Sequence, residues 1–278
     1  AVENNAFGFH TLYNTTIGVR NTGMGYKVLE SNTNGNSNSG FGASVLAALS
    51  TGSNNTGSGS QVMMNLTSGN SNTAMGSGSL TAMTAASQNS AFGTSSLASN
   101  LTGGDNSAFG YRALTSNTAG QNSAFGSLAL ENNIAAFNAA GGYRALQANV
   151  SGSGNTAWGH SAARSNVTGS EIAAFGTNAL ALSTANFNTA VGYDVLSSVI
   201  SGTRNTGVGN RALRANVASD NTSLGYNSLL LNTNGARNTA GGSLALSSNI
   251  LSSDNTALGA SALELTTGYS NTAIGASA

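Results

Sequence analysis

A short internal repeat constrains this chain more than any other feature of its sequence. The segment NSAFGYRALTSNTAGQ at 106–121 has recognisable copies that begin at residues 4, 21, 38, 55, 72, 89, 106, 122, 138, 155, 172, 188, 205, 221, 238, 255 and 271. The step from one unit to the next is always 16 or 17 residues. A fixed short period predicts a repeat fold, in which one unit alone buries almost nothing and is stabilised by stacking on its neighbours.

One column of the repeat never varies. Counting the opening Asn of each unit as position 0, position 4 is Gly in all seventeen units. Such a column predicts a backbone with positive φ, or a place too tight for a Cβ, and we interpret it as the corner that ends a strand. We name it the glycine column; its members include Gly8, Gly25, Gly42, Gly93, Gly110, Gly126, Gly159, Gly192, Gly225 and Gly259.

Three other columns predict a narrow interior that is built one layer per unit. Position 2 is small, position 8 is Leu in fourteen of its sixteen occurrences, and position 12 is mostly β-branched, as in Val150, Ile200 and Ile250. Burying each Leu contributes roughly 1.5–3 kcal/mol, so this leucine column supplies much of the expected driving force. Its members include Leu12, Leu29, Leu97, Leu114, Leu130, Leu146, Leu196, Leu213 and Leu263.

Asn occupies two further columns, at positions 0 and 11, as in Asn106 and Asn117. The clear exception in the opening column is Ile172. Stacked Asn side chains hydrogen-bond to the layers above and below them, so we expect Asn ladders at the turns.

Period and composition together favour strands over helices. Units of 16 or 17 residues leave no room for two helices, and their Gly, Asn, Ser and Thr content disfavours a helix. The regular Leu and Gly columns also argue against a disordered, low-complexity chain. We therefore predict an all-β fold, a parallel β-solenoid (a β-roll or β-helix) of about seventeen coils.

We expect residues 1–278 to form a single repetitive domain. With coils about 4.8 Å apart, it would be a rod of roughly 80 Å. Neither end of the sequence carries an obvious cap, which predicts either a fragment of a longer fibre or ends that stack on other molecules.

The charge balance excludes some classes of partner. Charged residues are 6% of the chain and the net charge is zero, whereas a nucleic-acid-binding protein needs a basic face. No apolar run approaches the length of a membrane span, so no membrane insertion is expected. The sequence has no Cys, which excludes disulfides and thiolate metal sites and is compatible with an extracellular protein.

The most informative surface candidate is the column at position 3. Strand alternation places it opposite the small column, so it faces outward if the small column faces inward. A bulge could reverse this parity and turn the column inward, and that alternative stays open here. The column is aromatic in its first two thirds and aliphatic in the last third; its aromatic members include Phe7, Phe41, Phe92, Phe109, Phe125, Trp158 and Phe175.

An outward apolar column of this length is too large to leave in water, which predicts burial against identical chains. A Thr column at position 1, as in Thr206 and Thr222, suggests ice binding as another use of the same face. No matching second rank of Thr lies beside it, and bulky residues follow two positions later.

No constellation of residues predicts an enzyme, a cofactor or a metal site. His10 and His160 occupy different columns, and the acidic residues form no repeated column of the kind that binds calcium. Asp105, Asp220 and Asp254 share the turn before position 0, but no second ligand accompanies them. We therefore expect no catalytic activity.

The units NTAVGYDVL, NTALGASAL and NSAFGYRALTSNTAG resemble the 17-residue repeats of bacteriophage tail-fibre and bacterial surface fibre proteins. Their opening strand is also similar to the NSVAIG-type strand of trimeric autotransporter adhesin heads, which form parallel β-rolls and trimerise. The resemblance covers essentially the whole chain, and it implies a fibrous β-solenoid on a virion or cell surface.

The functional expectation is a structural fibre protein. It would self-associate laterally or end to end into an extracellular filament or fibre shaft, with adhesion as an added role. The alternative is a binding module, which uses the Thr column for ice or acts as an adhesin for a host surface or glycan.

Overall fold

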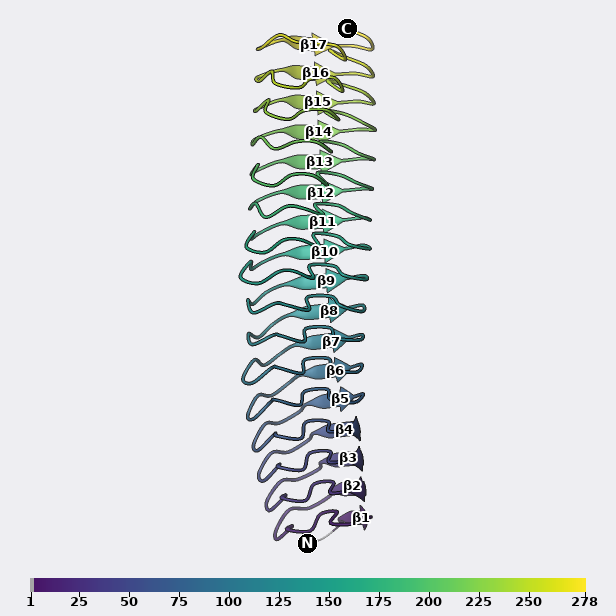
Figure 1. Ribbon diagram of the computed structural model, residues 1–278, viewed down its shortest axis with the longest axis vertical. Coiled ribbons are helices and arrows are strands. Elements are labelled where there is room, and N and C mark those ends of the chain that lie inside the picture. The colour runs from purple at the N-terminus through teal and green to yellow at the C-terminus, as the bar shows by residue number, and fades with distance from the viewer. Residues whose placement is uncertain (1–2) are drawn as a thin grey trace. The chain divides into compact units, whose positions relative to one another are not determined.

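The computed structural model describes residues 3–278, and the predicted fold is confirmed (Figure 1). This part of the chain contains seventeen parallel strands and no helix, with one strand in each repeat that begins at position 1 and ends at position 3, or at position 5 in three repeats. Residues 3–138 form one compact unit and residues 139–278 another. Each unit is a stack of β-solenoid coils.

The first unit contains eight strands, each hydrogen-bonded in parallel to the next along the chain. The register is kept column by column, so that Phe92 lies beside Phe109 and Phe109 beside Phe125. The strands are β1 (Asn5–Phe7), β2 (Thr22–Tyr26), β3 (Ser39–Ala43), β4 (Thr56–Ser60), β5 (Thr73–Met75), β6 (Ser90–Phe92), β7 (Ser107–Phe109) and β8 (Ser123–Phe125).

The second unit contains nine strands in the same parallel arrangement. Steps of 16 and of 17 residues both preserve the register, because the one-residue difference falls outside the strands. The strands are β9 (Ala139–Gly141), β10 (Thr156–Trp158), β11 (Ala173–Phe175), β12 (Thr189–Val191), β13 (Thr206–Val208), β14 (Thr222–Leu224), β15 (Thr239–Gly241), β16 (Thr256–Leu258) and β17 (Thr272–Ile274).

The glycine column follows each three-residue strand and has φ between 117° and 142°. Space is as restrictive as the dihedral: a Cβ on Gly225 would lie 2.5 Å from the carbonyl oxygen of Gly242 in the next coil. The column is therefore glycine for both reasons, a positive φ and a backbone approach that no side chain permits.

Three further corners per coil use residues that rarely adopt a positive φ. The leucine column has φ near 50°, for example 54° at Leu114 and 50° at Leu196. The left-handed region costs an L-residue roughly 1–2 kcal/mol, which is comparable with the roughly 1.5–3 kcal/mol that burying the Leu contributes. The other corners are the residue before the opening Asn, which we name the start corner, and position 6, the end corner.

The interior contains the leucine column, the small column and the residue that precedes each Leu. Leu114, Ala113 and Ala108 have no exposed surface in the first unit, and the same holds for Leu196, Val195 and Ala190 in the second. Sequence patterning predicted the first two columns. The residue before each Leu is the third buried column.

The prediction that the β-branched column lies in the interior is wrong. Ile134 is 47% exposed, Ile200 60% and Ile250 51%. The residue before each of them, such as Asn133, is buried, and the chain turns there so that the next side chain faces solvent. The main chain at this column still joins the coils, since Val150 N–H donates to the Val167 carbonyl at 2.9 Å.

Asn ladders are present, and they are buried inside the coils. Asn38 has no exposed surface; its Nδ2 donates to the Gly52 carbonyl at 2.8 Å, and its Oδ1 accepts the main-chain N–H of Asn55 at 3.0 Å. Most opening Asn residues thus close their own coil and hold the next coil in register. Ile172 interrupts this ladder because its side chain has no oxygen to offer Asn188 in the following coil.

Gly225→Ala tests the glycine corner. The added methyl group meets the Gly242 carbonyl while φ stays at 141°, so we expect a loss of roughly 3 kcal/mol or more in the free energy of unfolding. The measurement is urea unfolding followed by circular dichroism. Tyr226→Ala, at the exposed neighbouring position, is the matched control and should change stability by less than about 0.5 kcal/mol. Equal stabilities of the two variants would contradict the role of this corner.

Candidate functional site

The candidate site is the strand face, which we define as the side chains at positions 1 and 3 of every strand. Small residues at position 2 are buried, as at Ala108 and Ala157, while position 3 is open to solvent. Phe109 is 37% exposed, Phe125 41% and Trp158 45%. Position 3 therefore points outward, and the structure gives no support to the inward alternative.

Every aromatic residue that the sequence singled out lies on this face. Phe92 is half-buried, whereas Phe7, Phe41, Phe109, Phe125, Trp158 and Phe175 are exposed. Phe41 lies in register between Met24 and Ser58, and Trp158 lies in register beside Phe175. We name the whole position 3 column the apolar stripe.

Three rings of the stripe form a stack along the first unit. The ring centroids of Phe92 and Phe109 are 4.9 Å apart, and those of Phe109 and Phe125 are 5.1 Å apart. Their planes differ by only 6° and 7°. Because each ring face lies against the ring of the next coil, the stack presents ring edges, rather than open ring faces, to a partner.

Two glycines leave gaps in the stripe of the second unit. At Gly141 the gap is covered, since a Cβ there would lie 2.1 Å from the Trp158 indole. At Gly241 the gap is partly open, because the nearest atom is a methyl carbon of Leu258 at 2.9 Å. The stripe therefore keeps a partly open notch at Gly241, between Leu224 and Leu258.

Charge is excluded from the strand face along the whole sequence. The nine basic and nine acidic residues all fall in three columns, which are the start corner, the end corner and position 9. Start and end corners border the strand face on its two edges. The face is thus an apolar centre between rims that carry the charge, which is the anatomy of a protein interface.

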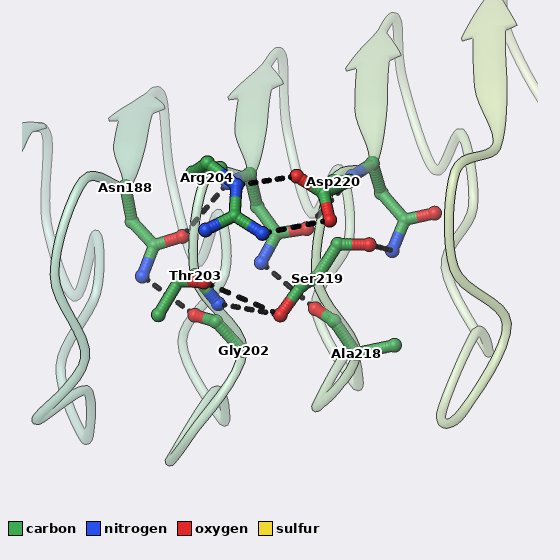
Figure 2. A network of polar contacts seen from close by, with 9 residues as sticks. Asn188, Gly202, Thr203, Arg204, Ala218, Ser219 and Asp220 are labelled. Carbon is green, nitrogen blue, oxygen red and sulfur yellow. Dashed lines mark hydrogen bonds and ion pairs between the residues drawn. The ribbon is translucent and has the colours of Figure 1, made fainter.

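The start-corner rim of the second unit has alternating charges that the sequence reading missed. Figure 2 shows Arg204, whose Nε lies 2.6 Å from an Asp220 carboxylate oxygen in the next coil. Arg237 and Asp254 repeat the pair at 2.6 Å. The sequence signal was present, since Arg and Asp alternate at this position in four successive units, but only acidic residues were compared between units.

Two kinds of hydrogen bond lie beneath this rim, as Figure 2 shows. Thr203 N–H donates to the Ser219 hydroxyl of the next coil at 3.0 Å, and the Asn188 amide donates to the Gly202 carbonyl of its own coil at 2.8 Å. The rim is therefore held both by a contact between coils and by the Asn contact that closes one coil.

The two histidines lie in different surroundings. His10 Nδ1 is 2.9 Å from a Glu30 carboxylate oxygen, and its ring stacks on Phe9 and Tyr13 at 4.1 Å and 4.5 Å. The hydrogen bond from His10 lowers the pKa of the Glu30 carboxyl below its ordinary value. His160 lies against Tyr143, with ring centroids 5.3 Å apart.

Six Thr side chains lie in register on successive strands of the second unit. They share position 1 of β12–β17, where each is paired to the next by the parallel ladder: Thr189, Thr206, Thr222, Thr239, Thr256 and Thr272. The column beside them on the same face is aliphatic, with Val191, Val208 and Ile274 among its members.

Other features of residues 3–278 point to no ligand chemistry. In this part of the chain no three His, Cys, Asp or Glu side chains come together to hold a metal ion, and no helix could cross a membrane. Surface recesses of about 260, 390 and 490 Å³ are present, the first lined by Ile250, Leu251 and Tyr269 among others, and none contains a cluster of titratable side chains.

No protein-family model, curated protein or solved structure matches this chain. The strand face, its rims and their geometry are therefore the basis for a functional proposal.

The rim pairs give a testable pH dependence. Hydrogen bonds from Arg204 and Arg237 lower the pKa values of the Asp220 and Asp254 carboxyls. The folded-state pKa lies below the unfolded value of about 3.9, so this stabilisation is present above that pH and disappears as the pH falls through the lowered pKa. We expect wild type to lose more thermal stability between about pH 5 and pH 2 than Asp220→Asn/Asp254→Asn does.

Thermal melts followed by circular dichroism make this comparison. Glu171→Gln, in the same column, is the control, because no ion pair joins Glu171 to another described residue. Parallel pH profiles for wild type and the double variant would show that the pairs do not contribute to stability.

Proposed function

We propose that this protein is a structural fibre protein that self-associates through its strand face into an extracellular filament or fibre shaft. The observation that carries the proposal is an exposed apolar stripe on a face from which every charged residue is excluded. The repeat supplies length, and the stripe repeats with it, so that contacts to a partner accumulate coil by coil.

The apolar area of the stripe is large enough to favour burial against a partner over exposure to water. An aromatic side chain has roughly 150–250 Å² to bury, so a ring that is about 40% exposed leaves roughly 60–100 Å² in water. Seven of the eight stripe residues in the first unit are Phe or Met, which together leave roughly 500 Å² or more. Soluble monomers rarely leave a contiguous apolar patch beyond a few hundred Å².

Another copy of the chain fits this surface better than a sugar does. Sugars bind aromatic side chains through open ring faces, but the Phe92–Phe109–Phe125 stack covers those faces with neighbouring rings. A face that repeats every coil is matched by a second face with the same repeat. The absence of Cys is compatible with the proposed location outside the cell, on a cell surface or on a virion.

Phe109→Ser/Phe125→Ser tests the proposal. The double substitution puts two hydroxyls in the stripe without touching the buried columns, so we expect assembly to fall sharply while the fold is kept. Assembly is measured by sedimentation velocity and negative-stain electron microscopy at two concentrations. The control is Phe137→Ser/Phe187→Ser, which removes two exposed rings from the start corner and should leave most of the assembly intact.

If the Phe109→Ser/Phe125→Ser variant is folded, as judged by circular dichroism, and assembles as well as wild type, the stripe is not the surface of self-association. A wild-type chain that stays monomeric at every concentration would reject self-association. The in-register Thr column of β12–β17 then favours the second candidate, ice binding, for which the readout is thermal hysteresis.

A further inference from the structure

We propose that β12–β17 is a contact through which two copies of this chain pair face to face with their coil axes antiparallel. This inference rests on the proposed self-association and adds to it an orientation, a register and a set of contacts. It rests on the order of charges along the start-corner rim of the second unit, and on the side chains that lie opposite each other when two such rims pair.

The start-corner rim of the second unit reads Arg204, Asp220, Arg237, Asp254 along successive coils. Reversing this order exchanges every sign. Two such rims placed side by side in opposite directions therefore set Arg204 against Asp254 of the second copy, and Asp220 against Arg237 of the second copy. All four contacts, including their symmetry mates, are attractive.

The four side chains are accessible for such contacts. Arg204 and Arg237 are 60% and 61% exposed, and Asp220 and Asp254 are 39% and 42% exposed. Each Arg already makes two hydrogen bonds to the Asp of the next coil, through Nε and one terminal nitrogen, so its other terminal nitrogen is turned elsewhere. Within each copy the pairs hold the rim in a fixed geometry before association.

Orientation decides which rims meet. In a face-to-face pair with antiparallel axes the start-corner rim meets its own copy in reverse, whereas with parallel axes it meets the end-corner rim. The parallel pair sets Arg204 beside Arg211 of the second copy in the same coil and offers Arg237 only Leu244. Charge complementarity in the second unit thus favours the antiparallel pair.

The same register gives a complementary fit on the face itself. The two-fold axis passes between β14 and β15, so Leu224 lies opposite the notch at Gly241 of the second copy. Val208 lies opposite Leu258, and the Thr columns oppose each other along all six strands. No charged side chain is enclosed anywhere on this face.

The contact is large enough for a specific but weak pair. Six strands about 4.8 Å apart span roughly 29 Å along the axis, and a strand with its corner spans about 20 Å across it. This gives roughly 600 Å² per copy, or about 1,200 Å² in total, at the lower limit of specific interfaces. The pair should therefore be weak, and it should weaken further as salt is added.

Charge reversal tests the rim contact in the full-length chain. Asp220→Arg makes both contacts with Arg237 of the second copy repulsive, and we expect the dissociation constant to rise about tenfold or more. Asp220→Arg/Arg237→Asp restores opposite charges between copies but breaks both pairs within each copy. Recovered association with lowered thermal stability is the expected result. If the double variant associates no better than the single variant, the rim acts only within one chain and the inference is overturned.

Cross-linking tests the orientation, and the chain has no native Cys to interfere. Thr189→Cys and Thr272→Cys chains are mixed in equal amounts and treated with a short bis-maleimide. Antiparallel pairing predicts mixed dimers, because Thr189 opposes Thr272 of the second copy, and few Thr189→Cys homodimers. Association with the reverse pattern would reject the antiparallel pair while leaving self-association in place, and an absence of association would reject both.

Discussion

The structure depends on one contact that recurs between all but a few successive coils: the side chain of an opening Asn accepts the main-chain N–H of the next opening Asn. In the first unit Asn55 Oδ1 accepts a hydrogen bond from the Asn72 N–H at 3.1 Å. In the second unit Asn221 Oδ1 accepts one from the Asn238 N–H at 2.9 Å. These side chains have no exposed surface. A buried amide without its partners costs about 1–3 kcal/mol, so the ladder fixes the register as well as stabilising it.

A fixed register makes every column a continuous feature of the surface. A slip of one residue would move each apolar side chain from one face of a strand to the other. Because the coils do not slip, Phe92, Phe109 and Phe125 stack, Thr189–Thr272 align, and Arg204 meets Asp220. The ladder thus aligns the columns that form the uncharged strand face and its charged rims. The proposals of self-association and of an antiparallel pair both rest on these aligned columns.

Much of the fold could be predicted from the sequence because position 4 and position 8 carry one residue type nearly throughout. The corner at Leu196 was missed because a positive φ is expected at a Gly such as Gly225, whereas at Leu its cost is offset by burial that a sequence does not display. The fixed offset of the β-branched column predicted that Ile200 lies in the core, but Ile200 lies at a bend and is exposed. The alternating rim that begins with Arg204 and Asp220 is visible in the sequence only when basic and acidic residues are compared in the same column.

Amide hydrogen exchange tests the ladder most directly. We predict slow exchange at the main-chain N–H of each opening Asn in residues 189–271, such as Asn205 and Asn221, and faster exchange at Asn188, which follows the break at Ile172. Ile172→Asn supplies the missing acceptor and should slow exchange at Asn188. Fast exchange at Asn205 and Asn221, or no difference between them and Asn188, would contradict the account in which buried Asn side chains hold the coils in register.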